Sequence, residues 1–467
     1  MMNMKGRTEE ESPDPIKDMD DIRPDGSVGH ESLGGGKHEG VQEPSMMECV
    51  LDRENLNRAW QRVRANHGAP GIDGLTIEQF PAFFREHWER LHSALMEGTY
   101  RPAAVRRVFI PKPDGSQRPL GVPTVLDRVI QQALAQVLNP LFESGFSDQS
   151  YGFREGRNAH QAVREVEACW KDRRRHAVDC DLKSFFDTVN HDRLMEQLRG
   201  KVRDRRVLAL IRRYLEAGVV LPDGNREATP RGVPQGGPLS PLLANIVLDP
   251  LDKELEKRGH RFARYADDFL IMVRSAKAAQ RVKESVTRYV EGTLKLVVNR
   301  TKSQSAPLKQ CTFLGFQIGA RGKVVWTAKV QERFKQRVRE ITSRNRGHRV
   351  QDVVAELGRY VLGWLGYFGI SHTYRVMLEL EEWVRRRVRL YYWKQWKRPG
   401  TRRRHLMALG ISKERVKLAS RSRKGYWRMS GNSVVQCALT NAWLKERGVP
   451  DMRAKWVAIH YPDPQGV

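Results

Sequence analysis

The sequence predicts an α+β fold between about residues 105 and 316, followed by a helical region. Three observations support this prediction. Short β-branched runs alternate with amphipathic stretches in the first region, strand-like runs stop after Trp326, and long Arg-rich segments with apolar residues at helical spacing follow. Helices packed on one sheet would bury both kinds of apolar pattern.

The first part of the chain has the composition of a disordered leader. Residues 1–45 are acidic and rich in Pro and Gly, with too few apolar positions to offset the entropy of ordering. Residues 1–50 carry 12 Asp and Glu against 5 Lys and Arg, a net charge of −7. Structure is expected to begin near Met47, where apolar residues start to recur at helical spacing.

The next elements follow from local periodicity. Strands are predicted at 105–110, 177–182 and 269–273, and helices at 125–138, 160–170 and 276–296. Helices are also predicted at 330–341, 353–368 and 374–396, and a new segment is expected after Pro399-Gly400. The chain therefore divides into 1–45, 46–320, 321–399 and 400–467.

The charge indicates a polyanionic partner. The chain of 467 residues has a formal net charge of +27, and residues 321–467 alone hold 33 Lys and Arg against 11 Asp and Glu, a net +22. Such an excess is typical of proteins that bind nucleic acid. A ribosome-like or membrane-surface role is the alternative that charge alone leaves open.

The cysteine content and the hydropathy of the chain indicate a cellular location. The five scattered cysteines show no paired spacing, which fits a reducing compartment without a zinc or disulfide framework. No apolar run reaches the roughly 18 residues of a membrane span. The expectation is a cytoplasmic protein with no membrane partner.

The strongest chemical motif is a pair of adjacent carboxylates, Asp267 and Asp268, between Tyr265 and an apolar run. An isolated Asp-Asp pair is more often a solvated turn. Here a second carboxylate, Asp181, ends another apolar strand where a helix is expected to start. A two-metal site requires carboxylates from separate strands, brought together around ions roughly 3.5–4 Å apart. These three residues can supply them.

The surrounding motifs, in order, resemble the reverse transcriptases of group II introns, which also act as intron maturases. The resembling stretches are 68–74, 109–123, 149–156, 179–189, 231–241, 265–273, 299–302 and 313–318, followed by a thumb-like helical segment. The resemblance implies a right-hand polymerase fold: fingers and palm with an antiparallel sheet over 46–320, a helical thumb or maturase domain over 321–399, and a basic DNA-binding region over 400–467. It also implies an RNA-directed DNA polymerase, a nucleotidyltransferase that assists splicing and mobility.

The resemblance assigns roles around the carboxylates. Asp181, Asp267 and Asp268 would hold two Mg²⁺ ions, with the Leu182 carbonyl as a further ligand, and hard oxygen ligands suit Mg²⁺. Lys302 corresponds to a lysine near the leaving pyrophosphate, a candidate general acid.

The resemblance also assigns the nucleotide pocket. Lys112 and Arg118 would bind the phosphates of the deoxynucleoside triphosphate, and Gln235 would contact nucleotide and template. Phe186 matches a steric gate that excludes a 2′-hydroxyl and so favours a DNA product over an RNA product. Gly315 lies in a stretch that resembles a primer grip.

Cations interleaved with aromatic residues in the last third suit binding to phosphates and stacking on bases. The expected partners are group II intron RNA, the DNA target and the primer. The candidate nucleic-acid-binding residues here are Arg385, Arg386, Arg387, Trp393, Trp396, Arg402, Arg403, Arg404, Arg423 and Lys424. The alternative for each is a helix with a solvated basic face and buried aromatics.

Some members of this family end in a nuclease domain with paired cysteines. Only Cys437 follows Cys311 here, so that domain is expected to be missing. Two further alternatives remain: a splicing cofactor whose polymerase has decayed, which the three intact carboxylates disfavour, and a domesticated relative that serves DNA repair, phage defence or CRISPR spacer acquisition.

Overall fold

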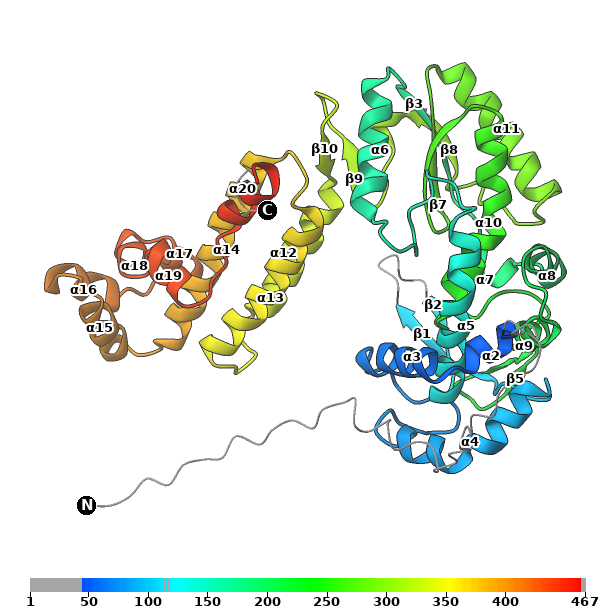
Figure 1. Cartoon of the computed structure of the whole chain (residues 1–467). Helices are drawn as coiled ribbons and strands as arrows, with labels where there is room; N and C mark the ends of the chain where they lie inside the picture. Colours follow the sequence, from blue (N-terminus) through cyan, green and yellow to red (C-terminus); the bar gives the residue numbers. More distant parts are fainter. Residues whose placement is uncertain (1–43, 112–114, 116, 463–467) are drawn as a thin grey trace, which may run out of the picture.

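The computed structural model describes residues 44–111, 115 and 117–462. Lys112 and nearly all of the predicted acidic leader lie outside these residues. Figure 1 shows two bodies, one that mixes helices with strands and an elongated helical arm, joined near strands β9 and β10. The α+β prediction and the arrangement of fingers, palm and helical thumb are confirmed.

The fingers combine helices with a small sheet. The helices are α2 (Met46–Leu51), α3 (Arg53–Ala65), α4 (Phe80–Met96) and α5 (Val125–Glu143). The sheet has the order β2-β1-β4-β5, with bounds β1 (Val105–Pro111), β2 (Gln117–Val122), β4 (Val219–Val220) and β5 (Arg226–Glu227). Asp52 separates α2 from α3 because its carboxylate accepts hydrogen bonds from two backbone N–H groups of the first turn of α3.

The palm is built on a four-stranded antiparallel sheet of order β6-β7-β3-β8. Its strands are β3 (His176–Cys180), β6 (Arg261–Tyr265), β7 (Asp268–Val273) and β8 (Gln304–Pro307), and the short helix η1 (Leu308–Gln310) follows. The other elements of this part are α6 (Ala159–Lys171), α7 (Phe185–Thr188), α8 (His191–Arg199), α9 (Arg205–Glu216), α10 (Ser240–Lys257) and α11 (Ala276–Gly292).

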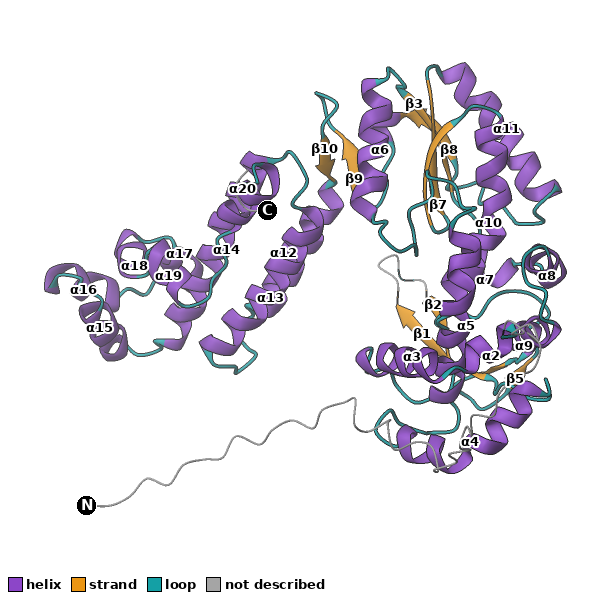
Figure 2. Ribbon diagram, in the orientation of Figure 1, coloured by secondary structure: helices purple, strands orange, loops and turns teal. Residues whose placement is uncertain are grey.

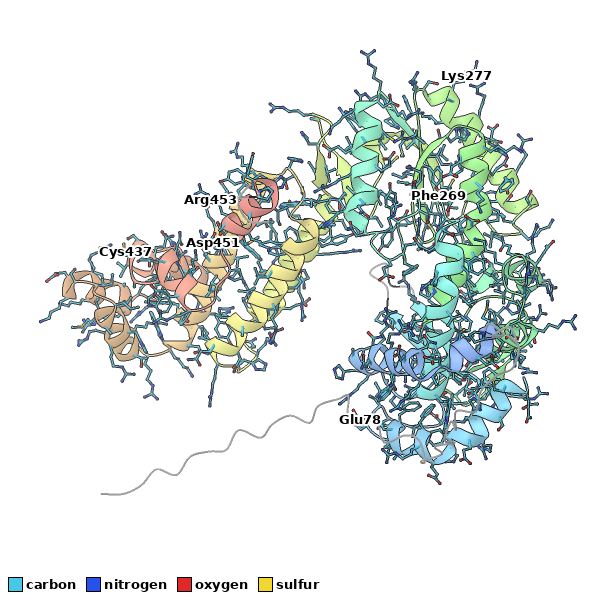
Figure 3. The ribbon with its side chains drawn as sticks, viewed as in Figure 1. Glu78, Phe269, Lys277, Cys437, Asp451 and Arg453 are labelled. Carbon is cyan, nitrogen blue, oxygen red and sulfur yellow. The ribbon has the colours of Figure 1, made fainter. Side chains whose placement is uncertain are left out.

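Both faces of this sheet are covered. Leu270 and Met272 of β7 pack with α6 residues on one side, whereas Phe269 and Ile271 pack with residues of α10 and α11 on the other. Alternate side chains of a strand point to opposite faces, which explains why β7 is apolar throughout after Asp268. Figure 3 labels Phe269 and so marks this strand.

The thumb is a bundle of helices that follows the ribbon β9 (Phe316–Ile318) and β10 (Val324–Trp326) (Figure 2). Its long helices are α12 (Ala328–Ile341), α13 (Val350–Phe368) and α14 (Tyr374–Gln395), close to the predicted ranges. The following helices are α15 (Pro399–Ala408), α16 (Lys413–Ser420), α17 (Tyr426–Ser430), α18 (Ser433–Ala438), α19 (Asn441–Glu446) and α20 (Met452–His460).

Residues 400–462 do not pack as one separate unit. Leu444, Met452 and Trp456 are buried in the same apolar cluster as residues of α12, α13 and most of the length of α14. Residues of α15, α16 and α18 form another cluster around the end of α14. Figure 1 accordingly shows α20 beside the thumb helices rather than at the far end of the arm.

Within the described ranges, no helix combines the length and the apolar character that are needed to cross a membrane.

Candidate active site

Two adjacent strand ends bring the three predicted carboxylates together. Tyr265 pairs with Asp268, so Ala266 and Asp267 form a two-residue turn between β6 and β7. Cys180 of β3 pairs with Phe269 of β7 in the antiparallel register. Asp181, the next residue, therefore comes level with Asp268 at one edge of the palm sheet.

Asp181 is held by the loop that precedes β8. Its carboxylate oxygen Oδ2 accepts a hydrogen bond from Asn299 Nδ2 at 2.8 Å. Its backbone N–H donates to Ser303 Oγ at 3.0 Å, and its carbonyl accepts from the Asn299 N–H at 2.8 Å. The position of Asp181 thus depends on two residues more than 100 positions later.

The electrostatics show a concentration of negative charge. Burial, together with the carboxylates of Asp179, Asp267 and Asp181, raises the pKa of Asp268 to about 7. Burial also raises the pKa of Asp267, and Asp181 adds to this, whereas the nearby Arg118 lowers it. Burial raises the pKa of Asp179 as well, and Asp181 contributes to that shift. Such mutual repulsion is what a bound cation would relieve.

Carboxylate oxygens are the type of donor that Mg²⁺ prefers. No group of three metal-ligating side chains is preformed among the described residues. Mg²⁺ is usually held by one or two carboxylates plus substrate phosphates rather than by an all-protein cage. Leu182 and Val298 form an isolated antiparallel β-bridge. Its two hydrogen bonds use the Lys183 N–H and the Asp181 carbonyl, so neither of them involves the Leu182 carbonyl.

The turn that carries Asp267 rests on a buried polar network. Arg264 is fully buried and donates bidentately to Asp252, which is also fully buried. Its Nη1 donates to Asn245 Oδ1 and to the Ala266 carbonyl, each at 3.0 Å. The Ala266 carbonyl in the turn therefore accepts a hydrogen bond from the charged guanidinium of Arg264. This charge-assisted hydrogen bond fixes the turn.

Gly152 lies directly against this turn. A Cβ atom at this position would stand 2.4 Å from the Ala266 nitrogen and 3.0 Å from the Tyr265 carbonyl carbon. Its carbonyl accepts a hydrogen bond from Asn245 Nδ2 at 2.9 Å. Only glycine allows the two backbones to approach this closely.

A pocket of about 730 Å³ lies between fingers and palm, lined in part by Arg118, Phe186 and Gln235. Three of the four residues predicted for nucleotide binding thus line one cavity, although they come from three separate segments. Lys112, the fourth, lies outside the described residues. Gly236 has a positive φ of 129°, and a Cβ there would lie 2.5 Å from the Gly121 carbonyl oxygen. This glycine lets the Gln235 loop pack on the finger strands.

Phe153 also lines this pocket and was not among the predicted site residues. Its side chain is 49% exposed, its φ is +60°, and its ring centre lies 6.4 Å from that of Tyr265. Phe153 thus combines an exposed ring with an unfavourable backbone conformation, a combination that indicates a functional site. The sequence alone does not reveal either feature.

Lys302 is exposed, and its backbone N–H donates to Asn299 Oδ1 at 3.4 Å. It therefore lies in the same short loop that holds Asp181. Gly315 lies where the palm meets the thumb, and a Cβ there would stand 3.1 Å from the Phe368 ring.

Three of the predicted nucleic-acid-binding residues are buried, and the prediction is wrong for them. Trp393 is fully buried and Trp396 is 6% exposed, so neither ring can stack on a base. Arg402 lies over the Trp393 ring and donates from Nε to the Trp396 carbonyl. The pattern of aromatics and cations instead forms the core between α14 and α15.

Arg385, Arg386 and Arg387 do not form one basic patch. Consecutive helical residues point in directions about 100° apart, and each of these side chains binds within the thumb. Arg385 pairs with Glu381 at 2.8 Å, and Arg386 lies over the Trp427 ring. Arg387 donates from Nε to Thr342 Oγ1 at 2.9 Å. The three guanidinium groups, which were predicted to bind nucleic acid, therefore make contacts within the bundle.

Arg403, Arg404, Arg423 and Lys424 are all exposed, on α15 and in the loop before α17. They remain available to a polyanion.

Several residues that were not predicted from the sequence contact or influence the predicted carboxylates. Asp179 could have been included, because it lies two residues before Asp181 on the same face of the strand. Arg264 carried a weaker signal as a charged residue within an apolar strand. The hydrogen bonds of Asn299 and Ser303 to Asp181 depend on tertiary structure.

Two family descriptions match the chain. Residues 110–318 match "Reverse transcriptase (RNA-dependent DNA polymerase)" and residues 331–410 match "Group II intron, maturase-specific domain".

Relatives include Protein YkfC of Escherichia coli (strain K12), which is 33% identical over 299 residues, covering 56% of this chain and 78% of the relative. Group II intron-encoded protein LtrA of Lactococcus lactis subsp. cremoris is 29% identical over 343 residues, covering 59% of this chain and 57% of the relative. Among solved structures, telomerase from Candida tropicalis aligns with a TM-score of 0.41 and 13% identity over 81% of this chain and 68% of that chain.

Proposed function

The chain belongs to the family of reverse transcriptases that carry a group II intron maturase domain, and on this premise we propose that it copies intron RNA into DNA by target-primed synthesis and assists splicing. One observation carries the proposal. Carboxylates from β3 and from the β6–β7 turn meet at one edge of the palm sheet, and the charge of Arg118, which lines the adjacent pocket, acts on Asp267.

We assign Mg²⁺ binding to Asp181, Asp267 and Asp268, with the Leu182 carbonyl as a further ligand. When bound, two such ions would lower the pKa of a primer 3′-hydroxyl and stabilise the leaving pyrophosphate. The protein contributes the orientation of these ligands. Asn299 and Ser303 hold Asp181, and Arg264 holds the turn below Asp267.

The pocket would receive a deoxynucleoside triphosphate. Arg118, with Lys112, would neutralise its phosphates, and Gln235 would contact the base or template strand. Phe186 would lie under the sugar and leave no room for a 2′-hydroxyl. Lys302, in the loop that holds Asp181, is the proposed proton donor to the pyrophosphate.

The maturase activity is proposed for the thumb. The matched maturase region covers 331–410, within the part of the chain that carries a net charge of +22. The exposed cations of α15 and of the 421–424 loop support binding to intron RNA or to the DNA target, because backbone phosphates attract such clusters.

The test is extension of a DNA primer on an RNA template in Mg²⁺. The Asp267→Ala/Asp268→Ala variant should lose synthesis by at least about 10³-fold, the scale expected when charge stabilisation at the transition state is removed. RNA binding should persist, because the basic surfaces are untouched. Glu86→Ala/Glu89→Ala, with both residues exposed on α4, is the matched control.

Residual synthesis near the wild-type rate in the Asp variant would refute the proposed active site. A splicing assay at low Mg²⁺, where the RNA needs help to fold, tests the maturase activity separately. Full extension with no effect on splicing would favour a domesticated polymerase over an intron-encoded one.

A further inference from the structure

A loop between α11 and β8 lies against Asp181 (Figure 1). The Asp181 N–H donates to Ser303 Oγ at 3.0 Å, and the Asp181 carbonyl accepts from the Asn299 N–H at 2.8 Å. The carbonyl of Ser303 in turn accepts from Lys283 Nζ of α11 at 2.9 Å. Both backbone groups of Asp181 are thus bonded to this loop, so the remaining freedom of Asp181 lies in the rotation of its carboxylate.

The Asn299 side chain has one amide orientation that satisfies all its neighbours. Its Nδ2 donates to Asp181 Oδ2 at 2.8 Å. Its Oδ1 accepts from the Thr301 hydroxyl at 2.8 Å and from the Lys302 backbone N–H at 3.4 Å. An ionised carboxylate only accepts hydrogen bonds, and a backbone N–H only donates them. If the amide nitrogen and oxygen changed places, an acceptor would face Asp181 and a donor would face Lys302.

This orientation engages one of the two oxygens of Asp181. Asn299 donates to Oδ2, and no residue in the described ranges donates a hydrogen bond to the other oxygen, Oδ1. A hydrogen bond to an ionised carboxylate is charge-assisted and stronger than one between neutral groups. It therefore restricts the rotation of the carboxylate and keeps Oδ1 available to a cation.

We infer that Thr301 and Asn299 are positioning residues that act one through the other on the carboxylate of Asp181. The Thr301 hydroxyl fixes the Asn299 amide, and the amide fixes the carboxylate for metal binding. The same amide oxygen accepts from the Lys302 N–H, so one side chain links the metal ligand to the proposed proton donor. The inference deepens the proposed function and rests on it, because it requires that Asp181 binds Mg²⁺.

Three substitutions separate the two contacts. Asn299→Leu removes the amide at nearly constant volume, Thr301→Val removes the hydroxyl, and Thr301→Ser keeps it. Asn225→Leu is the matched control, because Asn225 Nδ2 donates to Asp223 Oδ2 at 2.8 Å in an exposed turn. It removes an Asn–Asp hydrogen bond of the same length outside the site.

The first measurement is Mn²⁺ binding to the full chain without nucleic acid, followed by the electron paramagnetic resonance signal of free Mn²⁺. Asn299→Leu should weaken binding about tenfold or more, the scale for loss of a hydrogen bond to a charged group. Thr301→Val should weaken it by up to about fivefold, the scale for one neutral hydrogen bond. Thr301→Ser and Asn225→Leu should stay within about twofold of wild type.

The second measurement is the Mg²⁺ dependence of primer extension. Asn299→Leu and Thr301→Val should need more Mg²⁺ for half-maximal rate, in the same order as their loss of Mn²⁺ binding. The KM for the nucleotide at saturating Mg²⁺ should stay within about twofold, because neither residue lines the nucleotide pocket.

Two results would overturn the inference. One is wild-type Mn²⁺ affinity in folded Asn299→Leu and Thr301→Val proteins. The other is an equal loss in Thr301→Val and Thr301→Ser, since the hydroxyl would then not be the group that matters. The Asp267→Ala/Asp268→Ala variant supplies the background of the binding measurement. If wild type binds Mn²⁺ no better than that variant, the metal site itself is refuted, and the proposed function falls together with the inference.

Discussion

Phe186 lies at the border between packing and recognition. Its ring is partly buried, contacts the palm core and meets Phe185 edge-on with ring centres 5.1 Å apart, while the residue also lines the 730 Å³ pocket. A smaller side chain should therefore open space at the sugar without removing a fully buried ring. The two roles predict different measurable effects.

We predict that Phe186→Val raises the use of ribonucleotides relative to deoxynucleotides by about tenfold or more, an effect worth about 1.4 kcal/mol at the transition state. The free energy of unfolding should fall by no more than about 3 kcal/mol, less than a full core truncation. Competitive incorporation measures the first effect and chemical unfolding the second. Phe83→Val on α4 is the control, and unchanged discrimination in folded Phe186→Val would leave Phe186 as packing only.

Asp268 gives a prediction about pH. Its folded-state pKa of about 7 lies above its ordinary value of 3.8, because burial and three carboxylates oppose its ionisation. The folded state then binds a proton that the unfolded state releases, so without metal the protein should lose stability as pH rises from about 4 through 7. Asp268→Asn should raise the melting temperature in EDTA more at pH 8 than at pH 5.5. An equal change at both values would contradict the assigned repulsion.

At the scale of elements, the β6–β7 hairpin depends on what lies below it. The Arg264–Asp252 pair is fully buried, so removing one partner leaves an unpaired charge in the interior. Burial raises the pKa of Asp252, and Arg264 opposes that shift. The pair therefore supports the turn only while both members are present.

We predict that Arg264→Met lowers the free energy of unfolding by about 3–5 kcal/mol, whereas Arg264→Met/Asp252→Leu is markedly more stable than the single variant. Both should lose primer extension, because neither supplies a donor to the Ala266 carbonyl. Chemical unfolding and extension assays on the two proteins check this. If Arg264→Met and Arg264→Met/Asp252→Leu were equally stable, Arg264 would not be needed to compensate the buried charge of Asp252.

Elements with strong periodicity could be predicted from the sequence, and their ends could not. The strand predicted to reach Leu182 ends at Cys180, because Asp181 leaves the ladder and bonds to Asn299 and Ser303. The helix predicted to reach Leu296 ends at Gly292. These ends are set by contacts with distant segments, which periodicity does not record.

The site shows the same division. The motifs of Asp181, Asp267 and Asp268 fall on adjacent strand ends, as the strand-and-turn reasoning predicted. The burial of Trp393 could not be predicted, because interleaved cations and aromatics look the same whether α15 covers them or solvent does. Arg264 holds the turn through the Ala266 carbonyl, and no side-chain pattern in the sequence indicates such a contact.

At the scale of the molecule, the end of the chain completes the thumb. Leu444, Met452 and Trp456 lie in the core of the long thumb helices, and the Trp456 indole donates to the Ser371 carbonyl at 2.9 Å. A truncation after Pro399 would expose this core as well as remove basic residues. Loss of RNA binding in such a protein would not distinguish unfolding from lost contacts, so charge has to be removed in place.

We predict that replacing Arg403, Arg404, Arg423 and Lys424 with Gln leaves the melting temperature within about 2 °C of wild type, because all four are exposed. Affinity for intron RNA should fall, and its log–log dependence on salt should become shallower by up to about 3, since each phosphate contact contributes roughly 0.7–0.9. The control replaces the exposed palm cations Arg274, Lys277, Arg281 and Arg288, of which Lys277 is labelled in Figure 3. Salt titrations of binding for the three proteins decide the matter. The alternative outcome is that the salt dependence of RNA binding becomes shallower in the palm control and stays unchanged in the thumb variant. Intron RNA would then bind along the palm, and the exposed cations of the thumb would bind another polyanion.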